Sequence, residues 1–211
     1  CKARGVRLFS DCVQAAATQD LKALCRRADG VSLSSHKIYG PKGAGALVVK
    51  QGVKLRPLLT GGEQERGLRG GTLNVAAIVG FSYALEAAQR TREEFCRKTL
   101  ALRTLFEEEI RSALGEAAEI DGENRAPNIS HITFRQGGEW LLHRLDLCGI
   151  ACSGGAACSA HSALPSHVML AMNRGGAAGK GVRFSFGKRT CEEEVRYAAA
   201  QLIALLRESK N

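Results

Sequence analysis

The sequence has no long apolar run and few prolines, and each shortage excludes a class of protein. No stretch of 18 apolar residues occurs in the 211-residue chain, and no charged-then-apolar leader opens it, so we expect no transmembrane segment and no membrane partner. Only 4 prolines stand beside 24 glycines, while hydrophobic residues make up 45% of the chain. This balance excludes a linker or disordered tail and is typical of a globular protein with one or two sizeable cores.

Basic residues outnumber acidic ones without forming a cluster. The 30 Lys and Arg against 21 Asp and Glu give a formal charge of +9, but the basic residues are dispersed along the chain. The 7 Phe, 3 Tyr and 1 Trp do not alternate with them as base stacking would require. We therefore expect a basic soluble enzyme and no nucleic-acid partner.

The cysteines lack the spacing of a metal or redox motif. There are 8 of them, and no two are spaced as CxxC. A chain of this length and apolar content does not need disulfides to fold. Reduced cysteines favour the cytoplasm of a bacterium or a mitochondrial matrix over secretion.

The first half of the chain predicts a βαβ unit. Apolar runs of strand length occur at residues 6–10, 31–34 and 44–49, and residues 15–27 have the spacing of a helix that lies on a sheet. Strand, helix and strand within about 30 residues indicate parallel pairing. Residues 61–72, rich in glycine and charge, are expected to form a loop.

The second half predicts long helices and then an α+β domain. Helical spacing occurs at residues 76–88 and 92–114. The later pattern predicts strands at 129–134 and 182–186 and helices at 139–148, from 166, and at 191–208, the last opened by a Thr190–Glu193 capping box. We expect three parts: residues 1–90 in a large α/β domain, 91–116 as a connecting helix, and 117–211 as a smaller α+β domain.

Lys37 is the strongest candidate for a reactive residue. It follows the strand expected at residues 31–34, and α/β folds bind ligands beyond the carboxyl ends of parallel strands. Lysine forms Schiff bases with aldehydes, and the nearby Ser34 hydroxyl and His36 imidazole can donate to a phosphate. The alternative is an exposed lysine in a glycine-rich loop.

Asp11 is expected at the same sheet edge as Lys37. It ends the first strand, 26 residues before Lys37, and parallel strands end at one edge. Pyridoxal phosphate (PLP) enzymes pair an acid with the pyridine nitrogen, and Gln14 could donate to the ring oxygen. The alternative for Asp11 is a helix N-cap.

Cys158 lies in a run of small residues. Residues 153–162 carry almost no bulky side chain, so we expect a loop with an accessible and reactive thiol. Cys152, six residues earlier, is the nearest competitor and is expected near a strand end. The alternative is an incidental surface cysteine.

Several separate motifs resemble the cysteine desulfurases of the NifS/IscS type over nearly the whole chain. They are DCVQ at 11–14, SHKIYGPKG at 35–43, GGEQERG at 61–67, RGGT at 69–72, RAPN at 125–128, the Cys158 segment with PSHV at 165–168, and RFSFG at 183–187. The resemblance implies PLP fold type I, with part of its large domain followed by a smaller α+β domain, and a homodimer.

The resemblance also implies which residues hold the cofactor. Lys37 is implied as the Schiff-base lysine. Asp11 would pair with the pyridine nitrogen, and Gln14 would contact the ring oxygen. Ser34 and His36 would bind the phosphate.

Three further residues are implied for substrate, sulfur and dimer. Arg183 would hold the substrate carboxylate, for which a planar guanidinium is suited. Cys158 would attack the sulfur of L-cysteine and keep it as a persulfide, releasing L-alanine. Thr72 would contact the phosphate of the partner subunit's cofactor.

The implied activity is delivery of sulfur to a scaffold or carrier protein for iron–sulfur cluster or thio-cofactor assembly, with no metal in the enzyme. The chain departs from the family pattern at Cys12 and Val13, where the family has a Thr between the Asp and the Gln. The family's N-terminal half has no counterpart, and the chain opens on Cys1, so we expect a fragment. The alternatives are a selenocysteine lyase and a non-catalytic homologue that acts only through dimer or partner binding.

Overall fold

The computed structural model describes residues 1–154, 167–172 and 180–208. The chain divides into two compact units, Cys1–Phe95 and Cys96–Asn211, which are described separately below. Among the described residues, no helix is both long and apolar enough to cross a membrane. The expected part boundaries at residues 90 and 116 stay predictions.

A three-stranded mixed sheet forms the first unit. After a short 3-10 turn (η1, Lys2–Arg4), strand β1 (Phe9–Asp11) pairs in parallel with β2 (Gly30–Ser34), as the βαβ pattern predicts. Strand β3 (Gly45–Val49) pairs with β2 in the antiparallel sense. The connection from β2 to β3 is shorter than the crossover of about a dozen residues that parallel pairing needs.

The helix expected at residues 15–27 is interrupted. A 3-10 turn (η2, Ala15–Ala17) comes first, and α1 begins only at Leu21 and runs to Arg27. Asp20 explains the break, because its carboxylate accepts hydrogen bonds from the backbone N–H groups of Lys22 and Ala23 and so caps the new helix.

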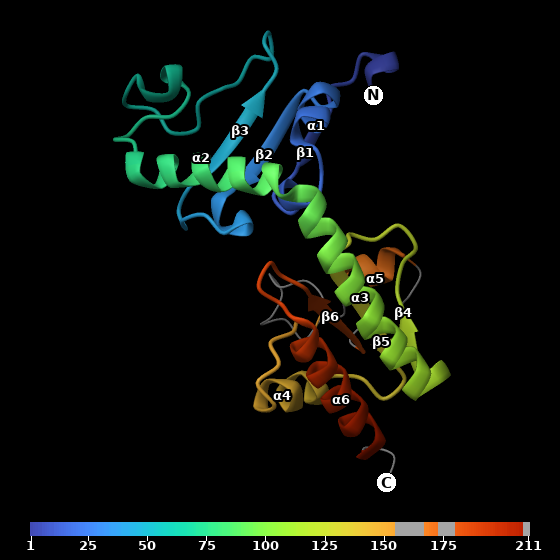
Figure 1. The fold of residues 1–211 in the computed structure, drawn as a ribbon. Helices are drawn as coiled ribbons and strands as arrows, with labels where there is room; N and C mark the ends of the chain where they lie inside the picture. The colour runs from blue at the N-terminus through green and yellow to red at the C-terminus, as the bar shows by residue number, and fades with distance from the viewer. Residues whose placement is uncertain (155–166, 173–179, 209–211) are drawn as a thin grey trace. The chain divides into compact units, whose positions relative to one another are not determined.

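Helix α2 (Val75–Arg90) packs against the first sheet and the turn that carries Lys37, and Figure 1 shows it crossing β2 and β3. Its Phe81 joins the core beneath Val31 and Leu33 of β2. The expected loop before α2 contains one further 3-10 turn (η4, Gln64–Gly67).

The second unit is an antiparallel sheet with helices on its apolar face. Its strands, in the order β4–β5–β6, are β4 (Ala118–Ile120), β5 (Ile129–Phe134) and β6 (Gly181–Ser185). The helical elements are α3 (Arg92–Leu114), η5 (Gly115–Ala117), α4 (Glu139–Leu147), α5 (His167–Ala171) and α6 (Glu192–Glu208). Buried residues of α3, α4 and α6 share one core with β5 and β6, and Phe106 lies 4.7 Å from Phe184, measured between ring centroids.

The start of α6 differs by one residue from the expected capping box. Glu194, not Glu193, accepts a hydrogen bond from the backbone N–H of Cys191 (3.1 Å), which makes Cys191 the cap. The Thr190 hydroxyl instead accepts from the N–H of Gly187 (2.9 Å). A run of three glutamates leaves the position of the cap ambiguous in the sequence.

Candidate functional site

The parallel pairing of β1 and β2 brings two candidate residues to one edge of the sheet. Asp11, the last residue of β1, is aligned with Ser32, and Ser34 ends β2 two residues further on. Lys37 follows in the 3-10 turn η3 (Ser35–Ile38). The expectation that Asp11 and the lysine turn lie at the same strand edge is confirmed.

Asp11 does not cap a helix. Its Oδ1 accepts hydrogen bonds from the Ser32 hydroxyl (3.0 Å) and from the backbone N–H of Val13 (3.0 Å), so it closes a local turn. The cap of α1 is Asp20. Among the described residues Asp11 Oδ2 has no hydrogen-bond partner, so this exposed oxygen is open to a ligand.

Ser34 and His36 form a second polar group at this edge. The Ser34 hydroxyl and His36 Nδ1 are 2.9 Å apart and share a hydrogen bond. Lys37 is exposed, and none of the described residues forms a hydrogen bond or ion pair with its ammonium. The amine is therefore free to react.

The turn that presents Lys37 packs closely against α2 through its buried residues. Ile38 and Ser35 are buried, and the backbone N–H of Gly40 donates to the Ser35 carbonyl (3.0 Å). A Cβ on Gly40 would lie 2.3 Å from Ser35 Oγ and 3.0 Å from Cβ of Ala84 on α2, so only glycine allows this approach. The reactive turn is thus exposed on one side and packed on the other.

These groups fit the cofactor that the family resemblance implies. A free amine, a carboxylate with an open oxygen and a hydroxyl–imidazole pair are the groups that suit an aldehyde, a pyridine nitrogen and a phosphate. Gln14 and Thr72 are both exposed, the first at the start of η2 and the second just before α2. The roles assigned to them stay predictions.

Arg183 lies on β6 in the second unit. It forms an antiparallel bridge with Ser153, whose N–H donates to the Arg183 carbonyl (3.1 Å) and whose carbonyl accepts from the Arg183 N–H (2.7 Å). Among the described residues, none forms a hydrogen bond with the buried Nε of Arg183. Cys158 lies outside the described residues, five positions after Ser153 in the sequence.

Cys152 has the properties of an unreactive cysteine. It packs against the core of the second unit directly before the Ser153 bridge. Burial, and the negative charge of Asp146, raise the pKa of the Cys152 thiol to about 11. Because the thiolate is the nucleophilic form, Cys152 is a poor acceptor of sulfur at neutral pH.

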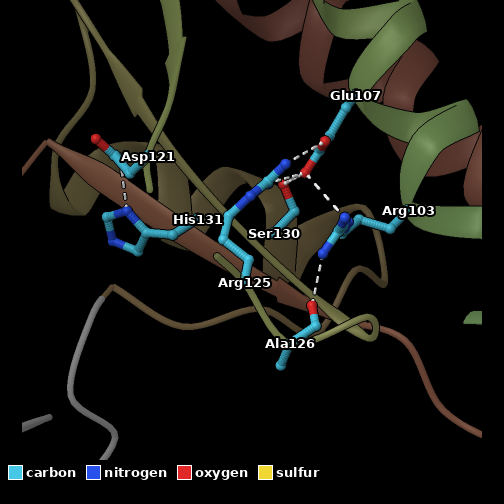
Figure 2. Close-up of polar contacts among 7 residues, drawn as sticks. All are labelled: Arg103, Glu107, Asp121, Arg125, Ala126, Ser130 and His131. Atoms are coloured by element: carbon cyan, nitrogen blue, oxygen red, sulfur yellow. Dashed lines mark hydrogen bonds and ion pairs between the residues drawn. The ribbon is translucent and has the colours of Figure 1, made fainter. Parts of the chain in front are cut away.

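Sequence reasoning missed a buried carboxylate that lies between two arginines (Figure 2). Glu107 on α3 accepts from both terminal nitrogens of Arg125, and its Oε1 accepts from the Ser130 hydroxyl (2.7 Å). Arg103 Nε lies 3.7 Å from the same oxygen. Burial opposes ionisation of Glu107, but the hydrogen bonds from Arg125 and Ser130 and both arginine charges outweigh it and lower the pKa.

Two other polar connections were also missed. The Gln89 amide on α2 donates to the carbonyls of Ala16 (2.8 Å) and Gln19 (3.1 Å) and accepts from the N–H of Leu21 (3.1 Å). In the second unit, His131 Nδ1 donates to Asp121 Oδ2 (2.7 Å). The i,i+4 spacing of Arg103 and Glu107 was a usable local signal, but Gln89 had none.

The fold and the residues at the strand edge fit the family that the sequence motifs resemble, and the comparison with known families agrees. The chain belongs to the class-V aminotransferase family, whose model matches residues 1–197. The expected absence of a metal stays a prediction; within the described parts of the chain, no three His, Cys, Asp or Glu side chains are grouped to hold one.

Within this family, the chain is similar to proteins that are named cysteine desulfurases. A cysteine desulfurase of Gluconacetobacter diazotrophicus is 40% identical over 194 residues, which cover 90% of this chain and 48% of that protein. The cysteine desulfurase NifS of Azotobacter vinelandii is 38% identical over 210 residues, covering 98% of this chain and 52% of the relative. The resemblance inferred from the motifs is confirmed, and the chain spans about half the length of the curated relatives it matches.

Solved structures agree on the fold. A NifS-like protein superposes with a TM-score of 0.85 at 32% identity, covering 98% of this chain and 54% of the other. A NifS-like protein of Rickettsia africae gives a TM-score of 0.85 at 26% identity, with coverage of 98% and 55%. The expected fold class is therefore confirmed.

Proposed function

We propose that this chain carries the lysine, cysteine and arginine of a PLP-dependent cysteine desulfurase. The observation that carries the proposal is the free Lys37 amine at the strand edge where Asp11 presents an open carboxylate oxygen. The names of the relatives favour this activity over the selenocysteine lyase and the non-catalytic alternatives. The substrate is L-cysteine and the products are L-alanine and an enzyme-bound sulfur.

Each residue of the first unit has a distinct task toward the cofactor. Lys37 binds the cofactor aldehyde, and its Nζ carries the proton that moves on and off the substrate carbon. Asp11 pairs with the pyridine nitrogen, Gln14 with the ring oxygen, and Ser34 with His36 binds the phosphate. When bound, PLP supplies an electron sink that weakens the bonds of the substrate amino acid.

Sulfur transfer needs a second nucleophile, and we assign it to Cys158. Its thiolate forms a bond to the substrate sulfur as the substrate C–S bond breaks, and a proton added at that carbon completes L-alanine. The raised pKa of Cys152 argues against the nearest alternative. Arg183 holds the substrate carboxylate, and the lack of a hydrogen-bond partner for its Nε among the described residues supports this role.

The proposed partners follow from the same activity. A homodimer would let Thr72 contact the phosphate of the partner subunit's cofactor. A scaffold or carrier protein would collect sulfur from Cys158, in a bacterial cytoplasm or a mitochondrial matrix.

Borohydride trapping tests the central assignment. Purified chain is incubated with PLP, reduced with borohydride, digested and analysed by mass spectrometry. We expect the PLP adduct on the peptide that contains Lys37, and its loss in Lys37→Ala. Lys42→Ala, which removes the next exposed lysine of the same loop, is the matched control and keeps the adduct. An adduct on Lys42, or none in the unsubstituted chain, would falsify the proposal.

A further inference from the structure

The sheet of the second unit has one apolar face and one polar face. Ile132 and Phe134 of β5 face the helices, and strand residues alternate, so His131 and Thr133 lie on the opposite face. On β6 the same alternation places Arg183 on that opposite face too. The proposed carboxylate clamp therefore shares its surface with His131.

His131 and Arg183 are direct neighbours across the two strands. Their Cα atoms are partners in the antiparallel register. The carbonyl of His131 accepts from Asp121 on one side, and the backbone of Arg183 bonds to Ser153 on the other. The two residues thus form a non-hydrogen-bonded pair, in which Cβ atoms approach to about 5 Å and side chains are closest.

The His131 ring is fixed from both sides. Its Nδ1 donates to Asp121 Oδ2 (2.7 Å), as Figure 2 shows. Its other edge lies over β6, because a Cβ on Gly181 would be 2.2 Å from His131 Cε1 and 2.7 Å from Nε2. A glycine at position 181 therefore leaves the space that the ring occupies, two residues before Arg183.

We propose that His131, held by Asp121 and seated over Gly181, is a positioning residue that orients the Arg183 guanidinium toward the substrate carboxylate. The ring limits the directions in which the neighbouring arginine side chain can turn. The Asp121 carboxylate, on the far side of the ring, supplies negative charge that favours a cation on this face. The inference rests on the proposed clamp role of Arg183.

Arginine Nε resonances of the 211-residue chain measure the orientation directly. The Arg183 signal is assigned by its loss in Arg183→Lys, and its heteronuclear NOE reports how rigid the side chain is. We expect a rigid Nε–H in the unsubstituted chain and a mobile one in His131→Ala. Gly181→Ala should have the same effect, since its methyl group displaces the ring while all polar groups remain.

Two variants separate positioning from general damage. His131→Asn keeps a donor toward Asp121 and should retain most of the rigidity. Thr133→Val is the matched control, because Thr133 also donates to Asp121 Oδ2 (2.7 Å) but is aligned with Gly181 instead of Arg183. A rigid Arg183 in both His131→Ala and Gly181→Ala, or equal mobility in Thr133→Val, overturns the proposal.

Titration with L-alanine, the expected product, connects orientation to binding. We expect His131→Ala to raise the Kd for L-alanine about tenfold, the scale of one misaligned charge-assisted hydrogen bond, with Thr133→Val unchanged. Ethylamine, which lacks the carboxylate, should bind equally to all variants. An unchanged Kd for L-alanine in Arg183→Lys overturns the clamp role of Arg183 itself. If the Kd rises in Arg183→Lys but stays unchanged in His131→Ala, only the positioning role of His131 is overturned.

Discussion

The polar side chains at the strand edge of the first unit and those around the sheet of the second unit differ in how many hydrogen bonds they form within the chain. At the strand edge of the first unit, Asp11 and Lys37 are exposed and make few or no contacts within the described chain. Around the sheet of the second unit, Glu107 and Asp121 are buried and accept several hydrogen bonds each. Groups left free are available for a ligand, whereas groups already satisfied stabilise the fold.

This difference predicts that substitutions fall into two sets. Changes at the first edge should remove chemistry and leave stability intact, since few native contacts are lost. Changes in the buried network should lower the free energy of unfolding before they affect chemistry. The predictions below test this separation, from the largest expected effect to the smallest.

Replacement of Cys158 gives the largest expected effect. Cys158→Ser should abolish persulfide formation and sulfide release from L-cysteine, while PLP binding by Lys37 is retained. Cys152→Ser is the matched control and should keep the activity, because the Cys152 thiol, with its pKa of about 11, is not the nucleophile. Mass spectrometry after incubation with L-cysteine should place the added sulfur on the Cys158 peptide; added mass on Cys152 would contradict the assignment.

Glu107→Gln should give the largest loss of stability. Without the buried carboxylate, two half-buried arginines lose their counter-charge, and breaking such a pair costs about 3 kcal/mol or more. Chemical denaturation of the second unit measures the change. Glu109→Gln, two residues along the same helix, is the control: it breaks the more exposed pair with Arg196 and should change stability far less. Equal losses in the two variants would remove the distinction between the buried and exposed pairs.

Gln89→Ala should destabilise the first unit by about 2 kcal/mol, since three hydrogen bonds are lost and two carbonyls and one N–H lose their partner. Hydrogen exchange should show faster opening of residues 16–21, which Gln89 joins to α2. Gln51→Ala, at an exposed position in the turn after β3, is the control and should leave exchange unchanged. Slow exchange of residues 16–21 in Gln89→Ala would show that the core alone holds this segment.

Local patterns predicted the elements better than their connections. The bounds of α3 agree with the expected 92–114, because apolar spacing over six turns is unambiguous. The break before α1 depends on a single cap at Asp20, and the direction of β3 depends on a short connection. The strand-edge site was predictable since parallel pairing places strand ends together, whereas Gln89 reaches partners about 70 residues away and has no local signal.

The smallest expected effect is the acid dependence of the Glu107 network. The native state holds the Glu107 pKa below its ordinary value of 4.5, because the hydrogen bonds from Arg125 and Ser130 and the charges of Arg125 and Arg103 outweigh burial. A carboxyl whose pKa is depressed on folding stabilises the protein above its unfolded pKa, and this contribution is lost as the pH falls through the folded pKa. The stability difference between the unsubstituted chain and Glu107→Gln should therefore be full at pH 6 and shrink progressively below about pH 4.5. Denaturant midpoints of the second unit, measured from pH 6 to pH 3 for both chains, give this difference. A gap that stays constant over the whole range would show that Glu107 acts through shape and hydrogen bonding and not through its charge.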